Sequence, residues 1–95
     1  KPNSVLEALA LGIPCVVPNL DSLKSFLTDK RDSFFFENGS VSDLSNAIRE
    51  CFHNSWSLRD NCITTALNFD ARKVTSLLDT IIGGLLDSKN AEVIQ

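Results

Sequence analysis

Ser4 and Glu7 are the first residues of the chain whose types and spacing could support a specific chemistry. They stand three positions apart at the head of an apolar stretch, which is the Ser-x-x-Glu spacing of a capping box. In a capping box the Ser4 hydroxyl accepts from the backbone N–H of Glu7, and the Glu7 carboxylate accepts from the N–H of Ser4. On this interpretation the pair only begins a helix.

The same position also suits an anion-binding site. A helix N-terminus presents unpaired N–H groups and the positive end of the helix dipole, and both favour a phosphate. In a parallel α/β sheet such helix starts lie at the carboxyl ends of the strands, where ligands bind. Glu7, one turn into the helix, could then accept hydrogen bonds from the two hydroxyls of a ribose. Local sequence leaves both interpretations of Glu7 open.

The elements expected around this motif alternate between helix and strand. Residues 4–11 have apolar residues at helical spacing and end at Gly12. Continuous apolar runs at 13–18 and 33–37 predict two short strands, the first buried on both faces. Between them, residues 19–28 predict a short helix capped by Asp21 or Ser22. This order predicts an α/β fold, a partial Rossmann-like domain with short parallel strands followed by three C-terminal helices.

Those three helices are expected over residues 40–54, over 55–69 and from Asp70 onward, where Asp70 can serve as the cap. Gly83 and Gly84 each cost about 1 kcal/mol inside a helix, so we expect a break or kink there and a frayed tail beyond. Trp56 is expected to pack in the core or between domains, and His53 to lie on the surface.

Composition excludes several classes of function. The net charge is −3 with no basic cluster, so nucleic-acid binding is not expected. No apolar run approaches the roughly 18 residues of a membrane span, and no leader precedes a cleavage site. The 3 cysteines are odd in number and widely spaced, which fits neither a disulfide framework nor a zinc site. We therefore expect reduced thiols, no bound metal and a cytoplasmic protein.

Residues 2–19, "PNSVLEALALGIPCVVPN", resemble the donor-binding segment of retaining, two-domain GT-B glycosyltransferases of the Glu-x7-Glu type (glycosyl transferases group 1). The positions that match that pattern are Pro2, Asn3, Leu6, Glu7, Ala8, Ala10, Gly12, Pro14, Val16 and Val17. The first glutamate would stand eight residues before Glu7, ahead of the chain. The chain also has no methionine, so we expect it to be the C-terminal part of a longer protein.

The resemblance implies a role for each matching residue. Glu7 would hold the ribose hydroxyls of the nucleotide, and the backbone around Lys1, Asn3 and Ser4 would face the diphosphate and the sugar. The absent first glutamate would contact the transferred sugar, so no catalytic residue is expected in residues 1–95. The longer protein would be a hexosyltransferase that moves a sugar from a nucleoside-diphosphate donor to an acceptor hydroxyl, with no cofactor and no required metal.

On the same basis, residues 1–95 would be the C-terminal part of the nucleotide-sugar-binding domain, and the N-terminal domain, which reads the acceptor, is absent. The expected process is polysaccharide, glycolipid or glycoconjugate synthesis. The expected place is the cytoplasm, with peripheral contact to the inner face of the membrane possible through the longer protein. The 95-residue piece alone is expected to be inactive.

Some positions depart from the family pattern. In "DSLKS", Asp21 and Ser22 replace the glycines of Gly-Gly-x-x-Glu, and Ser25 replaces its glutamate. In "DKRDS", Lys30 and Ser33 stand at two further glycine positions, and Ala71 replaces a tryptophan near the last helix. These departures support a second hypothesis, a catalytically inactive relative that serves as a binding or scaffold module.

Overall fold

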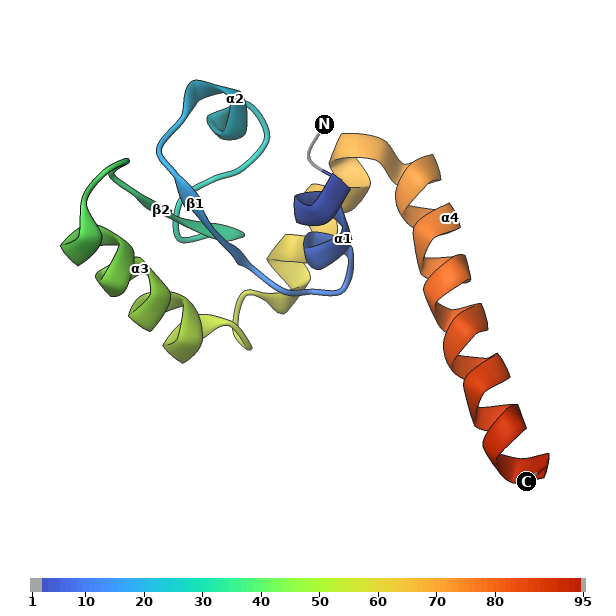
Figure 1. Cartoon of the computed structure of the whole chain (residues 1–95). Helices are drawn as coiled ribbons and strands as arrows, with labels where there is room; N and C mark the ends of the chain where they lie inside the picture. The colour runs from blue at the N-terminus through green and yellow to red at the C-terminus, as the bar shows by residue number, and fades with distance from the viewer. Residues whose placement is uncertain (1–2, 95) are drawn as a thin grey trace.

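The computed structural model describes residues 3–94, with side chains for residues 4–86 (Figure 1). Its elements in chain order are α1 (Asn3–Ala10), β1 (Cys15–Pro18), α2 (Asp21–Lys24), β2 (Ser33–Phe36), α3 (Val41–Asn54) and α4 (Arg59–Ile94). Within α4 the backbone leaves helical geometry at Asp70, so this element is two helices that meet at a kink. The alternating elements followed by three C-terminal helices confirm the predicted α/β class.

The two strands pair in parallel, with Cys15 opposite Ser33 and Pro18 opposite Phe36. After β1 the N–H of Asn19 donates to the carbonyl of Phe36 at 2.9 Å, which extends the pairing by one bond. In the described part of the chain the sheet has these two strands alone. Accordingly only Val17 of β1 is buried, while the other residues of this strand are half-buried rather than covered on both faces as predicted.

The outer edge of β2 is closed by groups from its own neighbourhood. The N–H of Phe35 donates to the carboxylate of Asp29 at 3.0 Å, and the N–H of Lys30 donates to the carbonyl of Ser33 at 2.8 Å. Just beyond the strand, the N–H of Glu37 donates to the carboxylate of Asp43. These bonds satisfy main-chain groups that an edge strand would otherwise leave open to pairing.

The core lies mainly between α1 and α4, and β1 adds to it. Its buried members are Leu6, Leu9, Ala10, Val17, Leu27, Cys62, Ala66 and Val74. Asp32 is the buried charged residue beside this core, and it accepts from the N–H of Thr28 and from the hydroxyls of Ser33 and Thr65. Because Thr65 belongs to α4, the Asp32 carboxylate ties the turn before β2 to that helix.

The helix starts confirm some predicted caps and contradict others. Asp70 caps the second helix of α4, since its carboxylate accepts from the N–H of Lys73 at 3.0 Å. The cap predicted at Asp21 or Ser22 is wrong, because both lie inside α2, and Leu20 occupies the N-cap position with no side-chain bond.

The predicted break at Gly83 and Gly84 is also wrong. The helix runs through both glycines to Ile94, so the tail is helical rather than frayed up to that residue. A cost of about 1 kcal/mol per glycine lowers helix stability without forcing a break, because the backbone hydrogen bonds do not need a side chain. Figure 1 shows this last stretch of α4 projecting away from the rest of the molecule.

Candidate functional site

The candidate site lies at the start of α1, on the side of the molecule where the strands end. The chain descends α1, turns at Gly12 and returns along β1, so the beginning of α1 and the end of β1 lie on the same side (Figure 1). In an open parallel sheet this carboxyl edge is where ligands bind. The predicted placement of the motif relative to the sheet is therefore the observed one.

The C-terminal turn of α1 closes the helix and packs against α4. Gly12 has φ of +81°, and the N–H groups of Gly12 and Ile13 donate to the carbonyls of Leu9 and Ala8, each at 2.9 Å. This is a Schellman motif, which closes a helix through a left-handed residue that is usually glycine. A Cβ on Gly12 would also stand 2.6 Å from Cγ of Arg59, so α4 packs closely against this turn.

Packing against α4 divides α1 into two faces. Leu6, Leu9 and Ala10 are buried, with exposures of 0 to 3%. Ser4 and Glu7, which are spaced one turn apart, point outward and are exposed. The buried face thus holds the helix in place while Glu7 stays accessible to a ligand.

The capping box predicted for Ser4 and Glu7 is not formed. α1 begins at Asn3, which places Ser4 inside the first turn rather than at the N-cap position. Across the described residues the structure gives no hydrogen bond or ion pair to either side chain. The carboxylate of Glu7 therefore does not cap the start of α1. Lys1 and the side chain of Asn3, the other predicted donor-binding groups, lie outside the described parts of the chain.

The family-pattern departures have distinct structural settings. Lys30 adopts φ of +66°, the left-handed conformation for which glycine is favoured, so it keeps the backbone of the residue it replaces. Ser33 lies in β2 and its hydroxyl donates to Asp32 at 3.0 Å. Asp21, Ser22 and Ser25 are exposed on or beside α2, at the carboxyl edge.

A hollow that the sequence did not reveal lies beside β2, between residues 19–30 and α3. It has a volume of about 690 Å³ and is lined by Asn19, Lys24, Lys30, Glu37 and Glu50 among others. The amine of Lys30 and the carboxylate of Glu50 stand 3.8 Å apart across it, as an exposed ion pair. Neither Ser4 nor Glu7 lines this hollow, so it is separate from the candidate site.

The three cysteines have thiols of low reactivity. Burial, followed by the nearby carboxylate of Asp32, raises the pKa of Cys62 to about 12, and burial likewise raises the pKa of Cys15 and of Cys51. The thiol of Cys62 donates to the carbonyl of Asp32, and that of Cys51 to the carbonyl of Pro14. Protonated thiols are poor nucleophiles and poor metal ligands.

The described residues contain neither a metal-binding cluster nor a helix that could span a membrane. No group of three or more His, Cys, Asp or Glu side chains there is placed to hold a metal ion. No helix in the described range is both long and apolar enough to cross a membrane.

Comparison with known proteins adds one finding. The family model described as glycosyl transferases group 1 matches residues 2–69, which include α1, both strands, α2, α3 and the first helix of α4. No curated protein and no solved structure matches the chain.

Proposed function

The chain belongs to the group 1 family of glycosyl transferases, and from this we propose that α1 forms the nucleotide-binding half of a sugar-donor site. The family assignment supports glycosyl transfer in general. The proposal adds a donor that is a nucleoside-diphosphate sugar and an acceptor that is a hydroxyl group. It places the nucleotide at the carboxyl edge of the sheet.

The proposal rests on the exposure of Glu7 and on its unbonded carboxylate within the described residues. Its carboxylate is exposed, takes part in no bond within the described residues, and stands one turn from a helix start at the carboxyl edge. A carboxylate in this position can accept from both hydroxyls of a ribose, and such charge-assisted bonds are stronger than neutral ones.

The helix start supplies the complementary half of the recognition. The first N–H groups of a helix lack partners in the helix, and together with the helix dipole they favour the diphosphate. We assign this contact to the backbone around Asn3 and Ser4 and to Lys1, while Pro2 has no N–H to offer. These groups would offset the charge of the departing nucleoside diphosphate, so this proposal needs no metal ion.

Nucleotide binding tests the assignment. Glu7→Gln in the intact protein should weaken the affinity for nucleoside diphosphates by about tenfold or more, since a hydrogen bond to a charged group contributes about 1.5–3 kcal/mol. Inorganic diphosphate, which has no ribose, should bind equally to both proteins. Asp21→Asn is the matched control, because it removes an exposed carboxylate at the same edge.

Isothermal titration with UDP, GDP and ADP measures these affinities. If every nucleotide binds the Glu7→Gln protein as well as the parent, Glu7 is not a ligand and the donor site lies elsewhere. If Asp21→Asn causes an equal loss, the effect is one of general charge and not of ribose recognition.

The replacements at Asp21, Ser22 and Ser25 favour a second candidate, a relative that binds the donor and does not turn it over. Such a protein would bind nucleoside diphosphates through Glu7 and yet release no nucleotide from a panel of sugar donors. Nucleotide release that depends on an acceptor would favour the enzyme. An acidic residue eight positions before Glu7 in the intact protein would favour it as well.

A further inference from the structure

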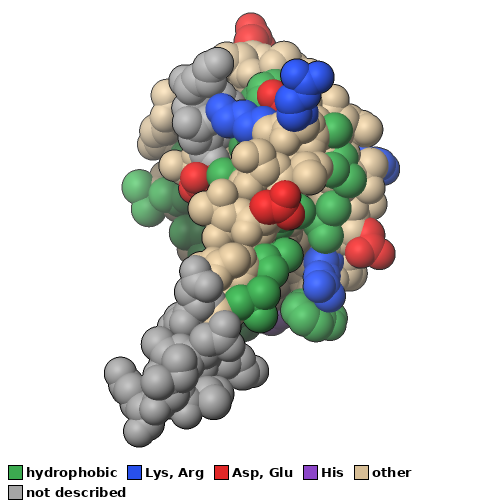
Figure 2. Space-filling model, turned by 90° about the vertical axis from the view of Figure 1, so that its right-hand side faces the viewer, with side chains coloured by type: hydrophobic (Ala, Val, Ile, Leu, Met, Phe, Trp, Pro, Cys, Tyr) green, Lys and Arg blue, Asp and Glu red, His purple; other side chains and the backbone are tan. Residues whose placement is uncertain are grey.

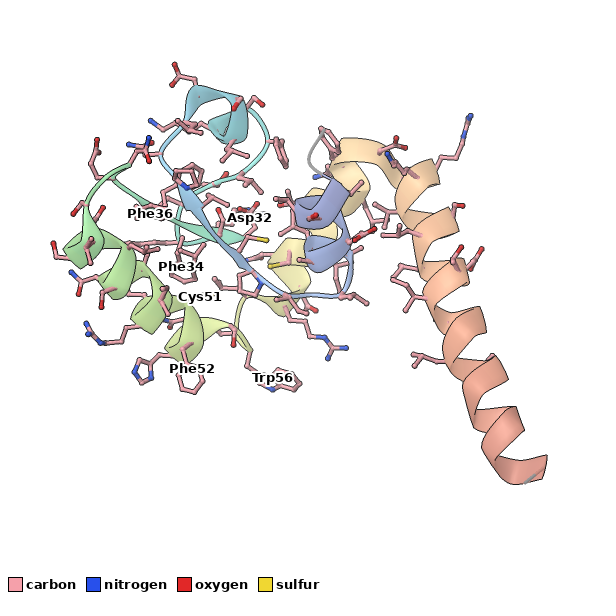
Figure 3. All side chains as sticks on the ribbon, viewed as in Figure 1. Asp32, Phe34, Phe36, Cys51, Phe52 and Trp56 are labelled. Atoms are coloured by element: carbon pink, nitrogen blue, oxygen red, sulfur yellow. The ribbon has the colours of Figure 1, made fainter. Side chains whose placement is uncertain are left out.

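The helix α3 buries little of its own surface. Ala47 is its buried residue, and Leu44 and Cys51 are half-buried. Figure 3 shows Phe52, near the end of the helix, and Trp56, in the turn beyond it, pointing away from the body of the molecule, and they are 81% and 83% exposed. The predicted core position of Trp56 is therefore wrong. With so little burial, the position of α3 depends on the hydrogen bonds at its first turn.

Those bonds join the end of β2 to the start of α3. Ser40 is the N-cap residue, and its hydroxyl accepts from the N–H of Asp43 at 3.1 Å. The carboxylate of Asp43 in turn accepts from the N–H of Glu37, and the N–H of Ser40 donates to the carbonyl of Glu37 at 3.0 Å. Asn38 and Gly39 are the two residues enclosed by this turn.

Asn38 and Gly39 form a pair that can react with itself. Both residues are exposed, and across the described residues no group bonds the side chain of Asn38 or the N–H of Gly39. Gly39 has φ of +90°, and beyond its chain neighbours nothing lies within 4 Å of where its Cβ would stand. Asparagine is a thermolabile residue. A following glycine favours its reaction, because no Cβ keeps the backbone nitrogen from the side-chain carbonyl.

We propose that Asn38 is a site of spontaneous deamidation whose isoaspartyl product loosens the start of α3. The backbone nitrogen of Gly39 attacks the side-chain carbonyl carbon of Asn38, and a C–N bond forms. The side-chain nitrogen leaves as ammonia and takes the proton of the Gly39 N–H. Water then opens either C–N bond of the resulting succinimide ring. One opening gives aspartate at this position, and the other gives isoaspartate, in which the backbone runs through the side-chain carbon.

The other asparagines with described side chains are less able to react. After Asn19, the N–H of the next residue already donates to a carbonyl at 2.9 Å. Asn54 donates its own side-chain amide to the carbonyl of Glu50 at 2.8 Å. The remaining ones lie inside helices, where backbone N–H groups are bonded: Asn46, Asn61 and Asn68. None of these precedes a glycine, so they serve as internal controls.

The two products should act differently on α3. Isoaspartate adds one carbon to the backbone of the turn, so the carbonyl of Glu37 and the N–H of Ser40 no longer meet. The Ser40 hydroxyl is then displaced from the N–H of Asp43, and the cap is lost. Aspartate keeps the original backbone, and its negative charge lies before a helix N-terminus, where it is favourable. This proposal does not depend on the donor assignment.

Peptide mass spectrometry of the intact protein, aged in warm and mildly alkaline buffer, tests the site. Asn38 should lose its amide before any of the internal controls and should give two acidic products that separate by chromatography. The matched variant Asn38→Gln should keep its amide over the same period, because its ring would need six members. Reaction of an internal control before Asn38 would overturn the proposal, and so would loss of the Asn38 amide in urea alone.

Thermal denaturation tests the effect on α3. The aged parent should unfold at a lower temperature than the fresh parent, whereas aged and fresh Asn38→Gln proteins should unfold alike. Asn38→Asp supplies the aspartate product by itself and should be as stable as the fresh parent. Circular dichroism of the fresh variants checks that they fold. Equal stability of the aged and fresh parent, or an equal loss in Asn38→Asp, would contradict the loosening of α3 by isoaspartate.

Discussion

Lys30 shows at the scale of one residue how a departure from a sequence pattern can leave the backbone unchanged. Its φ of +66° is costly for a residue with a Cβ, and the turn 28–33 keeps this conformation through the bonds of Asp29, Asp32 and the Lys30 N–H. The family pattern has a glycine at this position, and the left-handed φ of Lys30 explains why. At Ser33, the other glycine position of that pattern, the residue lies in a strand and needs no special conformation.

Lys30→Gly should therefore raise the free energy of unfolding by about 1 kcal/mol, because glycine adopts a positive φ without strain. The lost ion pair with Glu50 is exposed and contributes little. Urea denaturation of the intact protein measures the change. Ser33→Gly is the control and should lower stability, since it removes the buried hydroxyl that bonds Asp32. A loss of stability in Lys30→Gly would contradict this account of the turn.

Cys62 gives the fold a dependence on alkaline pH. Its pKa of about 12 in the folded chain exceeds that of an exposed thiol, which ionises near pH 8.5 to 9. Above that pH, unfolding releases a proton that the folded thiol keeps, so stability should be full below about pH 8.5 and should fall as the pH approaches 12. Chemical denaturation at a series of pH values measures the slope. Cys62→Ala should flatten it, and an unchanged slope would assign the effect to other groups.

At the scale of elements, the sequence predicted what short-range patterns control. The apolar runs at 13–18 and 33–37 contain the two strands, and the predicted cap at Asp70 forms at an aspartate placed just before apolar periodicity. The capping box at Ser4 and Glu7 failed because the motif requires a helix that begins at Val5, whereas α1 already includes Asn3 and Ser4. The first and last residues of a helix vary by one or two positions, and the spacing of residues in a motif does not determine them.

Removal of the cap at Asp70 should lower the stability of the fold, since this residue stands at the kink between the two helices of α4. Asp70→Ala should lower the free energy of unfolding by about 1 kcal/mol, and Asp70→Asn should lower it less because asparagine also caps well. Thermal denaturation compares the variants. Ser22→Ala, at a predicted cap that forms no cap bond, serves as the control and should change stability little. Equal effects of Asp70→Ala and Asp70→Asn would argue for charge rather than capping.

The whole molecule reveals what neither motif nor periodicity could predict. Periodicity placed Val41, Ile48 and Phe52 on the apolar stripe of α3, yet these residues are 53 to 82% exposed. The periodicity of α3 shows that these side chains favour an apolar environment, but it does not identify what packs against them. Periodicity could not predict the hollow beside β2 either, because its lining comes from four separate segments. Figure 2 shows further hydrophobic side chains at the surface of another face.

Sugar transfer depends on groups from the whole molecule. We expect the isolated 95-residue chain to transfer no sugar, because the proposed site supplies groups for the nucleotide and none for the reacting carbon. An assay of nucleoside-diphosphate release from a panel of sugar donors, with and without acceptors, tests this. The intact protein under the same conditions is the control. Turnover by the isolated chain would show that residues 1–95 contain a complete active centre.

The closed edge of β2 also bears on self-association. Asp29, Asp43 and the turn at Lys30 occupy three of the groups through which another strand would add on that side, namely the N–H groups of Phe35 and Glu37 and the carbonyl of Ser33. On the other side, β1 is flanked by Pro14 and Pro18, which have no N–H, so Val16 alone can offer both a donor and an acceptor. Cross-β stacking needs two open edges per chain. A proteolytic fragment with this sheet should therefore pair at most once along β1, and it lacks the second edge from which an amyloid fibre would grow.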